Sequence, residues 1–439
     1  MTGVIFSVFS LKYFSKKRKM TITDLKSFFL GSLFLFSGFS FGQPKFDSPA
    51  PNYIKTIELK GNSGINGNPV ISLGETLTLK FDDIIGDEAD YYYTIEHLNY
   101  DWTPSELVKS EYMAGFDNVR IFSYTNSYNT LQPYTNYELR IPNRDTQGLK
   151  VSGNYIINVF NSEKELVFSR RFMVYQPLTQ VQAQIKRSRD LQFINQKQVV
   201  NFSISSPDLL LRNPERTVNV MILQNHDLKG AITNIAPQYS LGNELIYRYD
   251  QPTSFWAGNE YLKFDSKDVR SSTVNIGRIE LRDLYHHFLF TDRTRESDPY
   301  TYNPDINGQF VVRTMQGQNP DIESEYVWTH FRLLNYDPLE GAEIHLYGAF
   351  NNFELDDSTL MKYNPESGLY ETALLFKQGY YDYTYVLLNK DGSLDPGYIN
   401  GNFEKTENEY QVLVYFRDIG ARYDQIIGVG SANSINITN

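Results

Sequence analysis

The sequence predicts an all-β protein, and three observations support this fold class. From Asn52 onward, short segments rich in β-branched and aromatic residues alternate with turns rich in Gly, Asn, Asp and Pro. In the segment Glu75–Phe81 every second residue is apolar, which is the period of a half-buried strand. No stretch keeps the 3.6-residue period of an amphipathic helix. Strand-like segments spaced by about 8–12 residues indicate serial β-sandwiches rather than alternating strands and helices.

The first segment in chain order has the pattern of a secretory leader. A basic cluster at residues 16–19 precedes the uncharged apolar run Ser27–Phe41. This run is shorter than the about 20 apolar residues of a membrane span. Ser40 and Gly42 are the small residues that a signal-peptidase cleavage site requires. We therefore expect residues 1–42 to be a cleaved signal peptide, with a single N-terminal anchor as the alternative.

Charge and cysteine content exclude several functions. The chain has 41 Lys+Arg and 52 Asp+Glu, a formal net charge of −11. Residues 1–42 hold six basic residues and one acidic residue, so the remaining chain carries −16 whether translation starts at Met1 or Met20. An acidic surface disfavours nucleic acid as a partner. The lack of cysteine excludes disulfides and thiolate metal sites, and together with the leader it favours the periplasm or the cell exterior.

The remaining chain is expected to form three consecutive immunoglobulin-like β-sandwich domains. Their predicted bounds are residues 43–177, 178–321 and 322–420, followed by a C-terminal tail at residues 421–439. Pro177 ends the first domain because proline cannot donate a hydrogen bond to a β-ladder. The second boundary lies in a segment rich in Asp, Asn, Pro, Arg and Gly. The tail is rich in Gly, Ser and Asn, and we expect it to fray beyond Val429.

Residues able to carry catalysis or to bind a metal form no recognised motif. The six histidines are His97, His226, His286, His287, His330 and His345. No two of them have the His-x-x-x-His spacing, and the adjacent His286 and His287 point to opposite faces of a strand. A nucleophile elbow, a phosphate-binding loop and a dinucleotide fingerprint are all absent from the sequence. We therefore predict no catalytic, cofactor-binding or metal site, and we do not expect an enzyme.

A calcium loop is the remaining metal-site alternative. Asn303, Asp305 and Asn307 place oxygen ligands at alternate positions before a glycine, as calcium loops do. However, the twelfth position is Thr314 instead of glutamate, and no flanking helices are predicted. The preferred interpretation is a polar turn that enters a strand at Gln309–Thr314.

The first predicted domain carries an ordered series of short motifs. They are Glu96–Trp102, Ser105–Leu107, Glu111–Phe116, Ser127–Thr130, Tyr134–Tyr137, Ile141–Asn143, Ser152–Tyr155 and Arg170–Val174. In order and spacing, residues 52–176 resemble the N-terminal domain of the plug protein of the type IX secretion system. The resemblance implies a non-enzymatic periplasmic protein that binds and seals the periplasmic opening of the outer-membrane translocon β-barrel. It further implies that the barrel is the partner and that the protein is attached peripherally to the outer membrane through it. Neither nucleic acid nor a small-molecule substrate is expected to bind. Partner-binding residues are not assigned.

Several side chains of this domain have expected structural roles. Trp102 is expected in the core or at a strand end. Tyr134 and Tyr137 are candidates for a tyrosine-corner hydrogen bond. Arg170 and Arg171 alternate on the last strand, so we expect one to meet an acid at the core edge. The other should be solvated or contact the partner.

The third predicted domain suggests an alternative function. Residues 326–417 resemble the early-set immunoglobulin-like modules attached to starch- and glycogen-active enzymes, through Ala342–Phe353, Tyr370–Leu375 and Gly379–Val386. That family binds sugar through a tryptophan where this chain has Phe353, which can stack but lacks the indole N–H. The alternative is therefore an exported carbohydrate-binding accessory protein. It requires Phe353, Tyr363 and Tyr370 to lie coplanar on one exposed face.

Overall fold

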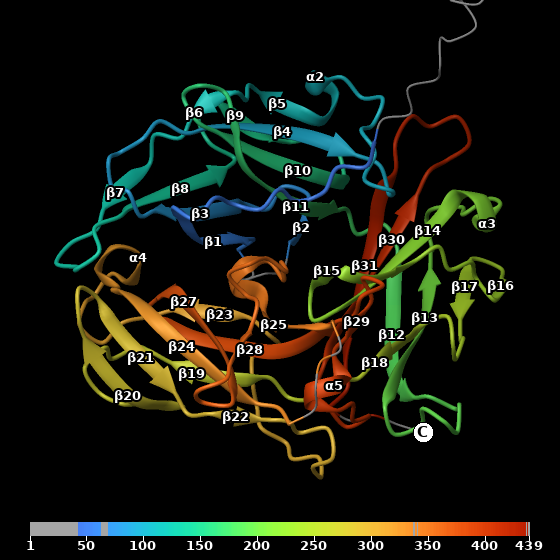
Figure 1. The fold of residues 1–439 in the computed structure, drawn as a ribbon. Helices are drawn as coiled ribbons and strands as arrows, with labels where there is room; N and C mark the ends of the chain where they lie inside the picture. Colours follow the sequence, from blue (N-terminus) through green and yellow to red (C-terminus); the bar gives the residue numbers. More distant parts are fainter. Residues whose placement is uncertain (1–42, 63–68, 337–338, 340, 436, 438–439) are drawn as a thin grey trace, which may run out of the picture. The chain divides into compact units, whose positions relative to one another are not determined.

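The computed structural model describes residues 43–62, 69–336, 339, 341–435 and 437 (Figure 1). The predicted signal peptide, residues 1–42, lies outside the described residues. Nearly all regular structure is strand, distributed over several sheets, which confirms the all-β fold class. Every helix in the described ranges is a single turn, and none is long and apolar enough to cross a membrane.

The first sandwich packs two sheets around one core. One sheet has the order β1 (Ile54–Lys60), β3 (Leu77–Asp83), β8 (Thr135–Ile141) and β7 (Tyr124–Asn126). The facing strands are β2 (Val70–Ser72), β11 (Leu166–Tyr175), β10 (Gly153–Phe160), β4 (Tyr92–Leu98) and β6 (Val119–Arg120), with α2 (Lys109–Tyr112) and the pair β5 (Met113–Gly115) and β9 (Thr146–Leu149) in the connections. Leu77, Leu79 and Phe81 are at most 1% exposed and lie in this core, which confirms the predicted alternation.

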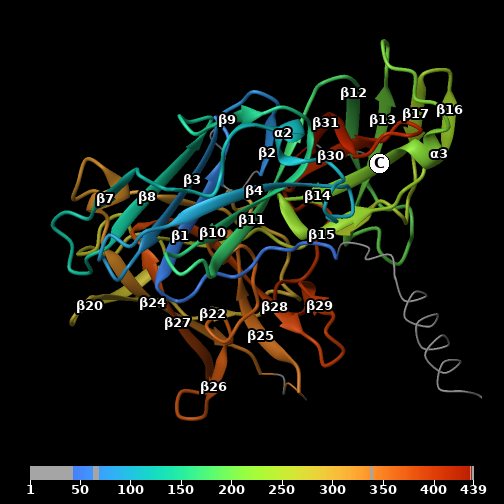
Figure 2. The same cartoon turned by 90° about the horizontal axis from the view of Figure 1, so that it is seen from above.

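The second sandwich combines strands from two distant parts of the chain. One sheet contains β12 (Gln180–Arg187), β13 (Lys197–Ser205), β16 (Tyr239–Leu241), β17 (Glu244–Tyr247) and β18 (Ser254–Trp256). The facing strands are β14 (Val218–Gln224), β15 (Asp227–Thr233), β30 (Glu409–Phe416) and β31 (Gln425–Asn433), and the turn α3 (Pro214–Thr217) precedes β14. In both views β30 and β31, drawn in red, lie beside β14 (Figures 1 and 2).

The third sandwich is formed by the residues between β18 and β30. One sheet contains β19 (Leu262–Asp265), β23 (Phe310–Val312), β25 (Glu343–Tyr347), β28 (Gly379–Leu388) and β29 (Leu394–Asp395). The other contains β20 (Ile276–Leu281), β21 (Tyr285–Leu289), β22 (Asp292–Arg293), β24 (Tyr326–Leu334), β26 (Lys362–Asn364) and β27 (Leu369–Lys377). The single turns here are α4 (Pro320–Glu323), η1 (Ala349–Asn351) and α5 (Gly397–Asn400).

The buried cores group the chain differently from the predicted bounds 178–321, 322–420 and 421–439. Phe264, expected in the second domain, packs in the core of the third sandwich, whereas Val412 packs in the core of the second. The third sandwich is thus an insertion within the second. The predicted fraying beyond Val429 is wrong, because β31 continues to Asn433 in register with β30. Pairing between strands so far apart in sequence leaves no local signal.

The first two sandwiches share one sheet. β31 runs parallel to β11, with Tyr175 opposite Ile426, and so joins the strands of both sandwiches into one nine-stranded sheet. A further core lies against this sheet, where Trp102, Met173 and Tyr415 are each at most 7% exposed. The burial of Trp102 confirms its predicted core position. Burial on both faces of the shared sheet ties the two sandwiches together without a flexible linker.

Candidate interdomain site

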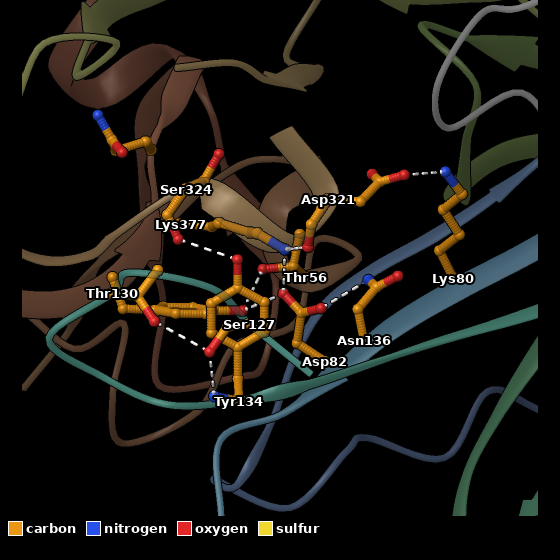
Figure 3. A network of polar contacts seen from close by, with 12 residues as sticks. Thr56, Lys80, Asp82, Ser127, Thr130, Tyr134, Asn136, Asp321, Ser324 and Lys377 are labelled. Atoms are coloured by element: carbon orange, nitrogen blue, oxygen red, sulfur yellow. Dashed lines mark hydrogen bonds and ion pairs between the residues drawn. The ribbon is translucent and has the colours of Figure 1, made fainter. Parts of the chain in front are cut away.

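The junction between the first and third sandwiches is centred on a buried ion pair. The Lys377 Nζ atom lies 2.7 Å from Asp82 Oδ2, and the two side chains are 1% and 0% exposed (Figure 3). The Tyr326 hydroxyl donates to the same oxygen at 2.6 Å, and Asn136 Nδ2 donates to Oδ1 at 2.7 Å. Asp82 therefore accepts three hydrogen bonds, which is the satisfaction a buried carboxylate needs.

The strand period explains how both charges come to this place. In β3, Phe81 points into the first core, so Asp82 points to the outer face of its sheet. In β27, Phe376 points into the third core, so Lys377 also points outward. Each charge would be exposed on an isolated sandwich. Contact between the sandwiches is therefore what buries the pair.

Further polar contacts surround the ion pair. The Lys377 ammonium lies 4.3 Å from the centre of the Tyr134 ring and donates to the Asp321 carbonyl at 2.6 Å. The Tyr134 hydroxyl crosses the junction to the Ser324 carbonyl at 3.0 Å. At the rim, Lys80 Nζ lies 2.5 Å from the Asp321 carboxylate. Burial, and then the Asp82 charge, raise the pKa of Tyr326, so its hydroxyl remains a donor.

Neither Tyr134 nor Tyr137 forms the predicted tyrosine corner, because each hydroxyl bonds to a distant backbone carbonyl. The arginine prediction is met. Tyr137 donates to the Ala89 carbonyl at 2.7 Å within its own sandwich, whereas Tyr134 bonds across the junction. Arg171 meets the Asp47 carboxylate at 3.3 Å, which confirms the expected pairing of one arginine with an acid. Arg170 is half-buried and donates to backbone carbonyls instead.

The junction of the first and second sandwiches is also polar at its edge. The Arg417 guanidinium pairs with the Asp424 carboxylate, with Nη2 2.8 Å from Oδ2. The same carboxylate accepts the Tyr100 backbone N–H at 2.8 Å. Deeper in the junction, the Tyr415 hydroxyl donates to Asn154 Oδ1 at 2.8 Å. Both junctions of the first sandwich are thus held by satisfied hydrogen bonds between groups distant in sequence.

Two of the histidines, His286 and His330, contact each other, whereas His97 and His287 each face a backbone carbonyl. Burial lowers the pKa of His97 to about 4, and its Nε2 faces the Ser152 carbonyl at 3.3 Å. His286 and His330 stack, with 2.8 Å between Nδ1 and Nε2, while His287 is buried against the Val269 carbonyl on the other face of the strand. Across the described ranges, no group of three or more His, Asp or Glu side chains is arranged to hold a metal ion.

The candidate calcium ligands have other partners. Asn303 Oδ1 accepts a hydrogen bond from the Lys263 ammonium at 2.9 Å. The Asp305 carboxylate accepts the backbone N–H groups of Tyr261 at 2.5 Å and Asn307 at 2.8 Å. Burial, and then the nearby Asp382, raise the pKa of Asp305 to about 8. The loop forms a polar turn before β23, and the Lys263 ammonium contacts it.

The exposed sugar-binding face predicted for the third sandwich is wrong. Phe353 is 6% exposed and packs against Tyr347, with ring centres 5.0 Å apart. The rings of Tyr363 and Tyr370 lie at 57° to each other rather than coplanar. A buried ring cannot stack on a sugar. The Phe-Asn-Asn turn therefore has a packing role.

Sequence reasoning did not identify Asp82, Tyr326 or Lys377. The available signal was a charged residue directly after a core phenylalanine near the end of a strand, as in Phe81-Asp82 and Phe376-Lys377. Such a residue is normally solvated. The pairing of these charges depends on how two sandwiches meet, which no local pattern encodes.

Comparisons with known proteins agree with the arrangement of the first sandwich. The family model for the type 9 secretion system plug protein 1st domain matches residues 54–176, the span from β1 to β11. A solved structure, a hypothetical protein from Parabacteroides merdae, is similar over 89% of this chain and 100% of its own, with 33% sequence identity and a TM-score of 0.85. Among curated proteins, none matches the chain.

Proposed function

The chain belongs to the type 9 secretion system plug protein family, whose first domain it carries at residues 54–176, and on this premise we propose that it is a non-enzymatic plug. It binds the outer-membrane translocon β-barrel of the type IX secretion system and seals the periplasmic opening of that barrel. Its place is the periplasm, at the inner face of the outer membrane. The match at residues 54–176 is the observation that carries the proposal.

Rigid coupling of the first sandwich to the rest of the chain supports a sealing role. A plug must keep its shape against a pore, and it needs no chemical step. Here the shared sheet fixes the first sandwich to the second, and the Asp82–Lys377 pair fixes it to the third. A flexible chain of separate modules would instead lose conformational entropy when it binds, which would weaken its affinity for the pore.

Exposed aromatic side chains on the first sandwich supply a contact surface. Phe116 and Phe122 are 75% and 69% exposed, and the Arg120 guanidinium lies 5.7 Å from the Phe122 ring centre. Aromatic and arginine side chains are enriched at the centres of protein interfaces. We expect these residues to contact the barrel.

Gene deletion and rescue test the proposal. Deletion should make the outer membrane permeable to vancomycin, which an intact outer membrane excludes, and the wild-type gene should restore the barrier. Affinity purification of the wild-type protein from envelope extracts should recover the translocon barrel. The double variant Phe116→Ser/Phe122→Ser should lose this recovery, while the control Phe290→Ser, at a residue 61% exposed on the third sandwich, should keep it. An intact barrier in the deletion strain, with no barrel recovered by the wild type, would contradict the proposal.

A further inference from the structure

A cavity of ≈500 Å³ lies where the three sandwiches meet. The first sandwich contributes β1 and the arginines of β11, the second contributes the start of β15, and the third contributes β27 and the turn η1. Its volume falls within the roughly 300–1,000 Å³ of ligand sites in proteins. Such sites occur preferentially at domain interfaces.

Two strands border this cavity. Six consecutive residues of β1, residues 54–59, and five consecutive residues of β27, residues 373–377, line it. A cavity lying over one face of a strand would be lined by alternate residues only, because successive side chains point to opposite faces. Consecutive lining residues therefore indicate that the cavity runs along the edge of β27. In β1 they follow from the β-bulge between Lys55 and Glu58, where Thr56 has a φ of 52°.

Both strands have an unpaired edge in the part of the chain that the structure describes. β1 is the terminal strand of its sheet and pairs with β3 alone. β26 covers β27 only at residues 369–371, so residues 373–377 have a strand neighbour on one side only. An unpaired edge presents a row of backbone N–H and C=O groups to whatever lies beside it.

The cavity lining holds five acidic and five basic side chains, and two of the basic ones lack an ion-pair partner in the described ranges. The lining acids are each engaged by a lysine, an arginine or hydrogen-bond donors: Asp47 by Arg171, Glu58 by Lys60, Glu354 by Lys229, Asp227 by Tyr347, and Asp356 by Ser358. Lys55 and Arg170 also line the cavity, and within the described ranges neither forms an ion pair. Burial lowers the pKa of both side chains, and the charges of Asp356 near Lys55 and of Asp47 and Glu354 near Arg170 counter this only in part. A carboxylate in direct contact would therefore offset their remaining desolvation.

We propose that this cavity binds an extended acidic peptide segment of a partner protein. The segment adds a strand along the free edge of β27, with β1 beside it, and its carboxylates pair with Lys55 and Arg170. Main-chain hydrogen bonds supply affinity in such strand addition, and alternate side chains supply specificity. Neither Phe116 nor Phe122 lines the cavity, so the peptide site is independent of the proposed sealing contact.

Peptide binding to the complete mature chain tests the proposal. The probes are fluorescein-labelled Val-Asp-Val-Asp-Val and Val-Lys-Val-Lys-Val, measured by fluorescence anisotropy. We expect the aspartate peptide to bind at least tenfold more tightly than the lysine peptide. Lys55→Gln and Arg170→Gln should each weaken it about tenfold, while Lys405→Gln, at an exposed lysine outside the cavity, should have no effect.

Hydrogen exchange separates strand addition from general charge attraction. The aspartate peptide should slow amide exchange in residues 54–59 and 373–377, and filling the cavity by Ala373→Phe should abolish both effects. Equal binding of the two peptides, or binding without protection at these edges, would overturn the proposal. So would glutarate alone binding as tightly as the aspartate peptide. The sealing assays do not depend on this outcome, because the Lys55 variant leaves the exposed aromatic surface unchanged.

Discussion

Replacing Lys377 by methionine leaves the Asp82 carboxylate buried without its ammonium partner. Methionine has similar length and fills the space, so the main change is electrostatic. Asp82 is 0% exposed and cannot regain solvent unless the two sandwiches separate. Removing one partner of a buried pair costs about 3–5 kcal/mol. The equilibrium constant for opening the junction should therefore rise by about two to four decades.

Urea unfolding measures this loss, with a matched control at the rim of the same junction. Lys80→Met removes the pair with Asp321, whose side chains are 17% and 35% exposed, and should cost only about 0–1 kcal/mol. In the double variant Asp82→Asn/Lys377→Met the charge is gone and the amide oxygen can still accept from Tyr326. It should recover more than half of the loss. Equal destabilisation by Lys377→Met and Lys80→Met would refute the assignment of this pair as the centre of the junction.

Three further predictions concern other parts of the chain. The raised pKa values of Asp305 and Asp382, about 8 and about 7, mean that these groups bind protons more tightly when folded, so their contribution to stability falls as pH rises from about 4 to about 8. Asp305→Asn should accordingly shrink the difference in melting temperature between pH 5 and pH 8.5, and an unchanged difference would contradict this. The lowered pKa of His97, about 4, predicts the opposite trend, with stability lost as pH falls below about 6.5; its imidazole signals in NMR should remain those of the neutral ring at pH 5.5. Phe353→Ala should lower the free energy of unfolding by about 3 kcal/mol in thermal unfolding, because the ring is 6% exposed. Retention on soluble glucan should not change, and a loss of retention would restore the sugar-binding alternative.

The strand period and the motif order predicted much of the first sandwich. Leu77, Leu79 and Phe81 alternate into the core as expected, because burial of one face imposes a period of two. Trp102 is buried, as the sandwich pattern indicated, and Arg171 meets an acid, as the alternation of the two arginines on the last strand indicated. The alternation of Leu77, Leu79 and Phe81 depends on neighbours within one sheet, whereas Asp47, the partner of Arg171, lies before the first strand.

The arrangement of the second and third sandwiches required the structure. β30 reads as one more strand of the domain that precedes it in sequence, yet it pairs with β14. Phe353 occupies the expected turn, but its burial beside Tyr347 depends on packing that the sequence pattern does not specify. The Asp82–Lys377 pair likewise depends on contact between sandwiches. Local periodicity does not specify which strands or side chains pair when they are far apart in sequence.

The central claim is that the mature protein seals the translocon barrel, and single-channel conductance tests it most directly. The purified barrel is reconstituted in a planar lipid bilayer, and the mature protein is added to the side that corresponds to the periplasm. The account predicts that the open-pore current falls to the level of the bare bilayer, and that Phe116→Ser/Phe122→Ser leaves it unchanged. A barrel current unaffected by excess wild-type protein would contradict the account.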